Sequence, residues 1–283
     1  MPPPVKHPPR KGITPPPPVG WCIYCGSTTP PLTKEHIIPE SLGGNLTLRD
    51  SSCEVCRDIT RRNEQKIARE VFQGIRAQLR MKIKEPPTHV LMRTGSEPDA
   101  ASFRVETKDH PNFLFITVPE PPGILSNRDP NAPVAMKPFF LSFEDKAAEL
   151  RRQSLGAPTK LYRDFDPLVM GRFLAKVGLG IALHHHGPTS IETDDIREII
   201  VGPRPPYHLV GGTELENIDL IEPYAPISHR GTAYSIDLNG EFYAAVQFQL
   251  FCQLGLPVFT IVVGKFTQAG LNKVVMENQF RYT

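Results

Sequence analysis

Residues 22–56 read CIYCGSTTPPLTKEHIIPESLGGNLTLRDSSCEVC, and this stretch decides the fold of the N-terminal part of the chain. Its two ends carry Cys-x-x-Cys pairs, Cys22 with Cys25 and Cys53 with Cys56. Two such pairs can close one tetrahedral site of four thiolates around a zinc ion. Disulfides are the alternative, but they belong to oxidising compartments, and the chain does not start with the charged and then apolar pattern of a secretory signal. We therefore predict a structural Zn²⁺ ion bound to the four cysteines.

The composition is that of a globular chain of one or two domains. The 283 residues are 40% hydrophobic, which is enough for a sizeable core, and the formal net charge is +2. Nine of the 31 prolines fall within residues 1–18, so we expect residues 1–19 to be a disordered, Pro-rich tail. The sequence offers no run close to the about 18 to 20 apolar residues that a membrane helix needs. We expect a soluble, cytoplasmic protein without a membrane partner.

Positive charge is concentrated directly after the second cysteine pair. From Arg57 to Lys84 there are nine basic and three acidic residues, a net charge of +6, which leaves −4 for the rest of the chain. A stretch of this kind suits a phosphate-binding face, although a solvated helix face has the same composition. The candidate nucleic-acid-binding residues are Arg57, Arg61, Arg62, Lys66 and Arg69.

The same stretch has the pattern of an amphipathic helix, because apolar residues recur every four positions. The apolar stripe consists of Ile59, Ile67, Val71, Ile75, Leu79 and Ile83. We predict a helix from Asp58 onward that ends at the prolines of positions 86–87. Asn63 falls on the stripe, so we expect its side chain to point inward. The prolines also mark a predicted boundary between a first domain, residues 20–84, and a second, residues 88–283.

The second domain mixes predicted strands and helices. Asn239-Gly240 is a strong signal for a two-residue hairpin turn. A turn-like segment at 109–112 joins the first two strands. The predicted strands are 102–107, 113–118, 232–238, 241–251 and 257–263. We predict an α+β domain with a mainly antiparallel sheet, and its sequence identifies no reaction.

Two helices are predicted in the second domain. Asp166 followed by Pro167 is a favourable start, with an N-cap carboxylate and a proline at the first helical position, and Gly187 ends this helix. A shorter helix covers 194–201 and stops at Gly202.

The first domain resembles the HNH endonuclease family in its four-cysteine, zinc-containing form. The matching segments are CIYCG at 22–26, EHIIP at 35–39, LGG at 42–44 and CEVC at 53–56. The resemblance covers about residues 20–75 and implies a small ββα-metal finger, in which two strands and a helix hold one catalytic divalent ion. It also implies metal-dependent hydrolysis of phosphodiester bonds in DNA, with RNA left open as a substrate.

The resemblance assigns roles to individual residues. His36 is expected to be the general base, which takes a proton from the attacking water. Glu35 is expected to bind the catalytic ion, Mg²⁺ or Mn²⁺, since hard cations prefer carboxylate oxygens. Asn45 is the nearest candidate for the family's asparagine that supports the histidine, although an asparagine in a tight turn is also an ordinary structural choice.

One position departs from the family pattern. The last metal ligand is commonly His or Asn directly after the second cysteine pair, and here that residue is Arg57, which cannot bind a cation. Asn63 or Asp58 can take its place. Without a substitute, the alternative is a catalytically inactive zinc module that binds nucleic acid, with a C-terminal domain for recognition or sensing.

Overall fold

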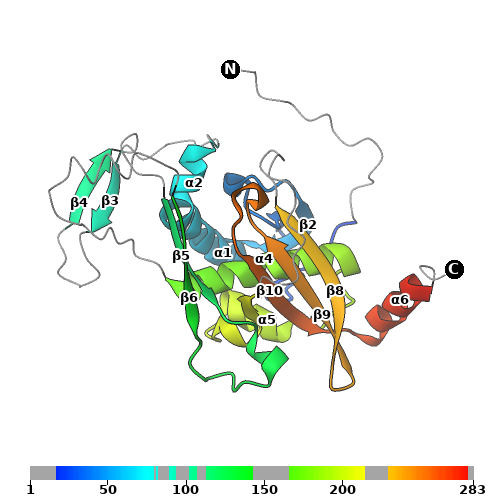
Figure 1. Ribbon diagram of the computed structural model, residues 1–283. Helices are drawn as coiled ribbons and strands as arrows, with labels where there is room; N and C mark the ends of the chain where they lie inside the picture. Colours follow the sequence, from blue (N-terminus) through cyan, green and yellow to red (C-terminus); the bar gives the residue numbers. More distant parts are fainter. Residues whose placement is uncertain are drawn as a thin grey trace.

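The computed structural model describes residues 17–79, 81, 89–93, 102–106, 113–142, 166–213 and 229–279. It has mixed α and β content with antiparallel sheets, as the sequence predicts. The central sheet has four strands, and Figure 1 shows a long helix running across it.

The N-terminal part of the described chain contains a ββα unit. Strand β1 (Leu32–His36) pairs antiparallel with β2 (Thr47–Cys53), and helix α1 (Glu54–Lys66) follows directly. This order confirms the small finger expected from the sequence.

A tight turn after β1 requires the Gly-Gly pair. The 3-10 turn η1 (Glu40–Leu42) ends at Gly43, whose φ of 89° lies in the left-handed region that favours glycine. A Cβ atom on Gly44 would fall 1.9 Å from the carbonyl oxygen of Ile38. The turn therefore brings the chain back to β2 through two positions that accept only glycine.

The basic helix differs from the prediction in its start and its continuity. It begins at Glu54, four residues before the expected Asp58, and η2 (Ile67–Val71), a π-helical turn, separates α1 from α2 (Gln73–Gln78). An apolar stripe with a strict period of four drifts by about 40° per repeat around an α-helix. The wider π turn offsets this drift and keeps the apolar residues of η2 against the core. Residues 82–88, including the expected helix end, lie outside the described part of the chain.

The central sheet has the strand order β7-β10-β9-β8, and its described pairs are all antiparallel. Its strands are β7 (Val210–Gly212), β8 (Arg230–Leu238), β9 (Glu241–Gln249) and β10 (Val258–Lys265). Asn239 and Gly240 join β8 to β9 with φ values of 58° and 85°, as a two-residue hairpin turn requires. The predicted hairpin and third strand are confirmed.

The strands expected at 102–107 and 113–118 are present, but they do not pair with each other. Strand β4 (Ser102–Glu106) pairs with β3 (His89–Arg93), and β5 (Phe113–Pro119) pairs with β6 (Met136–Ser142). The turn-like segment 109–112 lies outside the described residues.

Other described elements are η3 (Gly123–Ser126), α5 (Asp194–Val201), η4 (Pro206–His208), η6 (Cys252–Leu254) and α6 (Gln268–Gln279).

Helix α4 (Pro167–His186) begins and ends where the sequence predicts. The Asp166 carboxylate accepts hydrogen bonds from the main-chain N–H groups of Leu168 and Val169, at 3.0 and 3.3 Å, and Gly187 follows the last turn. The sequence predicts no membrane helix, but by length and mean hydropathy, 1.2, α4 could cross a membrane. However, 67% of its apolar window is buried within the protein, so α4 serves as the core helix.

Helix α4 packs between the central sheet and the N-terminal finger. A Cβ atom on Gly178 would meet the side chain of Ile261 in β10 at 2.8 Å, and one on Gly180 would meet Ile37 beyond β1 at 3.0 Å. Positions two apart on a helix face opposite sides. The buried apolar residues accordingly form one cluster that includes both the finger and the C-terminal elements.

Gly180→Leu tests this close packing. The larger side chain has to separate α4 from Ile37, so we expect a loss of about 1–3 kcal/mol in the free energy of unfolding, measured with urea. Gly180→Ala is the matched control, because its strain against Ile37 is partly offset by a gain in helix propensity of about 1 kcal/mol. Equal stability of Gly180→Leu and wild type would contradict the packing of α4 on the finger.

Candidate metal centre and active site

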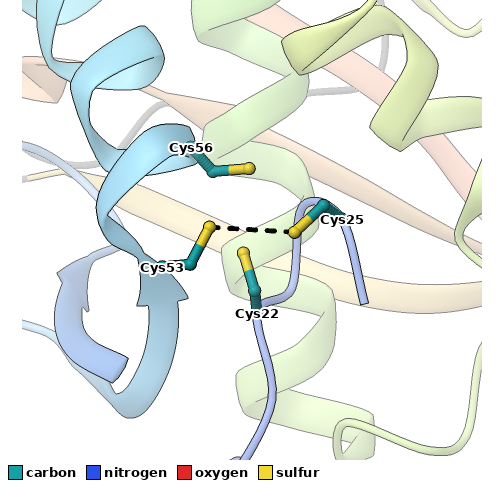
Figure 2. Close-up of side chains that lie close together, drawn as sticks. All are labelled: Cys22, Cys25, Cys53 and Cys56. Carbon is teal, nitrogen blue, oxygen red and sulfur yellow. Dashed lines mark hydrogen bonds between the residues drawn. The ribbon is translucent and has the colours of Figure 1, made fainter. Parts of the chain in front are cut away.

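The four predicted zinc ligands come from three adjacent pieces of the finger. Cys22 and Cys25 lie in a tight loop before β1, closed by a hydrogen bond of 2.8 Å from the Gly26 N–H to the Cys22 carbonyl. Cys53 ends β2, and Cys56 lies in the first turn of α1. Figure 2 shows their sulfur atoms pointing toward one another.

The sulfur positions fit a tetrahedral zinc ion. All four Sγ atoms lie within 4.8 Å of one another, and those of Cys25 and Cys53 are 3.7 Å apart. Zinc–sulfur bonds of about 2.3 Å in a tetrahedron place sulfur atoms about 3.8 Å apart. The four cysteines form no disulfide. Burial raises the pKa of the Cys22 and Cys56 thiols, so a dication is needed to hold both as thiolates.

Helix α5, which belongs to the C-terminal part of the chain, contacts the cysteine loop through Arg197. The Arg197 Nε atom donates to the carbonyl of Ile23 at 3.0 Å, and its guanidinium lies 5.0 Å from the centre of the Trp21 ring. A cation over an indole face is attracted by the ring quadrupole. The cysteine loop is therefore fixed both by its own chain and by α5.

His36, the expected general base, is the last residue of β1 and is half-buried. Burial lowers the pKa of the imidazole, and the positive charge of Lys34 lowers it further, while Glu40 acts in the opposite direction. The neutral ring is the form that can accept a proton. Lys176 donates a hydrogen bond to the main-chain oxygen of His36, so this hydrogen bond does not involve the imidazole ring.

Glu35, the expected metal ligand, lies in a buried ion cluster. Only 6% of the residue is exposed, and its Oε1 atom lies 2.9 Å from the Nζ atom of Lys176 in α4. The same Nζ atom lies 2.7 Å from Oε1 of Glu64 in α1 and donates to the Ile37 carbonyl at 3.2 Å. Burial lowers the pKa of Lys176, but the two carboxylates outweigh this effect and raise it, so the ammonium is charged.

Tyr24 completes the surroundings of this cluster. Its side chain is fully buried, and burial together with the charges of Glu35 and Glu64 raises the pKa of its phenol. The interior between β1, α1 and α4 therefore holds two acids, one lysine and one phenol.

As these side chains lie, they do not fit a catalytic divalent ion at Glu35. The Lys176 ammonium holds the carboxylate that the ion would need, and its positive charge repels a dication at that distance. Arg57 occupies the position of the family's last ligand and forms ion pairs with Glu54 at 3.3 Å and Asp58 at 3.7 Å.

The three other candidate positions lie in different surroundings. Asn63 is half-buried and lines a cavity of about 10 Å³ together with Glu64 and Lys176, consistent with the inward orientation expected for it. Asp58 is exposed beside Arg57. Asn45 is exposed in the loop before β2. The carbonyl of the next residue, Leu46, accepts a hydrogen bond from the Ile37 N–H group.

Three of the five candidate phosphate-binding residues, Arg61, Arg62 and Arg69, are exposed on α1 and η2. Arg57 and Lys66 are half-buried, and Lys66 forms an ion pair of 3.2 Å with Asp166 at the start of α4. Arg76, which contributes to the basic count, is 7% exposed and donates to the carbonyls of Ser41 and Ala68. It therefore supports the Gly-Gly turn instead of facing solvent.

Sequence reasoning missed Lys176 and Glu64. A signal for Lys176 was present, because it is the only charged residue in the otherwise apolar stretch 173–183. A lone lysine in a buried helix needs an acidic partner. The sequence does not reveal which acids supply it.

Comparison with known proteins identifies the N-terminal part of the chain. A family model described as HNH endonuclease matches residues 22–72. Comparisons with curated proteins and with solved structures gave no match. By its ββα order, its cysteine cluster and this match, the segment 22–72 is similar to HNH endonuclease domains.

Proposed function

We propose that this protein is an endonuclease that hydrolyses phosphodiester bonds in DNA, with His36 as the general base. The observation that carries the proposal is the HNH match over residues 22–72, which contains His36 at the end of β1 in the cysteine-stapled ββα unit. Such a domain implies a nucleic-acid substrate.

The proposed step is hydrolysis. A water molecule attacks the phosphorus atom, its proton passes to the neutral imidazole of His36, and the bond from phosphorus to the leaving sugar oxygen breaks. The lowered pKa of His36 supports this role, because the ring is available as a base near neutral pH.

The role of Glu35 as a ligand of Mg²⁺ or Mn²⁺ stays a prediction. Its carboxylate pairs with Lys176, so metal binding there requires the lysine to leave. Likewise, the supporting role of Asn45 and the ligand role of Asn63 stay predictions, and we derive no catalytic step through them.

A plasmid-cleavage assay tests the proposed activity. The zinc-loaded full chain is incubated with supercoiled DNA in the presence of Mg²⁺, Mn²⁺ or EDTA, and nicked and linear products are separated on a gel. Cleavage with either ion and its loss in EDTA support a metal-dependent nuclease. If DNA is bound but neither DNA nor RNA is cut under any condition, the endonuclease proposal is wrong and the nucleic-acid-binding alternative replaces it.

The exposed arginines of α1 and η2 are proposed to bind backbone phosphates. Replacing Arg61, Arg62 and Arg69 together by Gln should weaken binding to all DNA sequences alike and flatten the salt dependence by about one unit of slope for each phosphate that is no longer neutralised. Fluorescence anisotropy at several salt concentrations measures both effects. Arg204→Gln is the control, since that arginine lies beyond α5 and pairs with Asp195. An unchanged salt slope in the triple variant would assign these arginines to ordinary solvated surface.

A further inference from the structure

The Glu35 cluster is built like a site for a small hard cation. Lys176 is 3% exposed, and four oxygen atoms surround its ammonium group. Two are carboxylate oxygens, from Glu35 and Glu64, and two are main-chain carbonyls, from His36 and Ile37. Carboxylate and carbonyl oxygens are also the ligands that hard divalent ions take in proteins.

We propose that Lys176 is the resident cation of this site and that the lysine and a divalent metal ion exclude each other at Glu35. The inference deepens the proposed function, since it concerns control of the same site, but metal binding can be measured without any DNA cleavage.

The charges of the site explain the exclusion. The buried Glu35 carboxylate and the half-buried Glu64 carboxylate repel each other, and both lose solvation, so a positive charge between them stabilises both. The lysine supplies it from within the chain. A dication that entered beside the ammonium would meet a like charge a few ångströms away in a poorly solvated interior.

The lysine also links the site to the C-terminal part of the protein. Lys176 belongs to α4, and Gly180, one turn further along the same face, packs on Ile37. A divalent ion can therefore reach Glu35 only if the Lys176 side chain turns away or α4 shifts from the finger. The adjacent cavity, which Asn63, Thr60 and Arg172 also line, offers space for about one water molecule beside the vacated position.

The test compares Mn²⁺ binding by the zinc-loaded full chain and by Lys176→Ala, using calorimetry and electron paramagnetic resonance. We expect Lys176→Ala to bind about one Mn²⁺ ion at least about tenfold more tightly than wild type, because a like charge has been removed from the site. The double variant Lys176→Ala/Glu64→Gln should lose this gain. Lys66→Ala is the matched control, because it removes another lysine that connects the finger to α4 without touching Glu35.

Thermal unfolding gives a second readout if Lys176→Ala folds poorly. Mn²⁺ should raise the unfolding temperature of this variant and not that of wild type, because a ligand that binds only the folded state stabilises it. Lys176→Gln, neutral and similar in length, repeats the comparison with less loss of packing. The proposal is overturned if wild type binds Mn²⁺ as tightly as Lys176→Ala and loses it in Glu35→Gln, or if the folded lysine variants bind no better than wild type. Where both lysine variants fail to fold, wild type is compared with Glu35→Gln alone, and tight Mn²⁺ binding by wild type that is lost in Glu35→Gln overturns the proposal.

Discussion

His36→Ala is expected to reduce the rate of DNA cleavage by about 100-fold or more, the usual effect of removing a general base. The imidazole is the group proposed to accept the proton of the attacking water. The variant keeps one structural contact, because the buried lysine donates a hydrogen bond to the main-chain oxygen of His36, which alanine also has. Zinc content and DNA affinity should therefore stay at their wild-type values while initial rates of plasmid nicking fall.

The control for this experiment is His185→Ala, which removes an exposed histidine at the far end of α4. Its cleavage rate should equal that of wild type. If His36→Ala cuts DNA as fast as wild type does, another group is the base. Glu35→Ala is a less direct test of catalysis, because it also deprives a buried lysine of one partner, a change that costs about 3–5 kcal/mol in comparable ion pairs.

Local signals in the sequence were enough to predict several elements. The Asp166-Pro167 start of α4 and the Asn239-Gly240 hairpin depend on residues next to each other in the chain, and both occur in the structure. The clustering of four cysteines also followed from sequence, because the Cys-x-x-Cys spacing specifies each half of the site.

The surroundings of Glu35 could not be predicted in the same way, because they depend on contacts distant in sequence. Lys176 donates to the main chain of His36 across 140 positions. The family resemblance covers only the finger, so it carried no information about a lysine supplied by α4. The Glu-His pattern suggested a metal ligand, and the fold instead brings an internal ammonium group to the same carboxylate.

The π turn was missed for a different reason. A period of four residues is typical of an uninterrupted helix over a few turns, but a straight α-helix cannot keep such a stripe on one face over many turns. The strict spacing of Ile67, Val71 and Ile75 was itself the signal for a local change in helix geometry.

Cys53→Ser is expected to remove bound zinc and unfold the HNH domain. The change leaves three thiolates for an ion that needs four, and structural zinc contributes on the order of 10 kcal/mol to the folding of small fingers. Elemental analysis should find about one zinc ion per chain in wild type and close to none in the variant. The single tryptophan, Trp21, lies beside the cysteine loop and against Arg197, so its fluorescence reports unfolding of this domain.

Cys252→Ser is the matched control for the loss of zinc. It removes the fifth cysteine, which is half-buried in η6 and lies outside the cluster, so it should keep about one zinc ion per chain and the wild-type fluorescence. Because α4 packs on Ile37, unfolding of the finger should also expose part of α4 and lower the stability of the C-terminal elements. Full zinc content in Cys53→Ser, or a Cys22–Cys25 disulfide in reduced wild-type protein, would show that these thiols do not bind a structural metal.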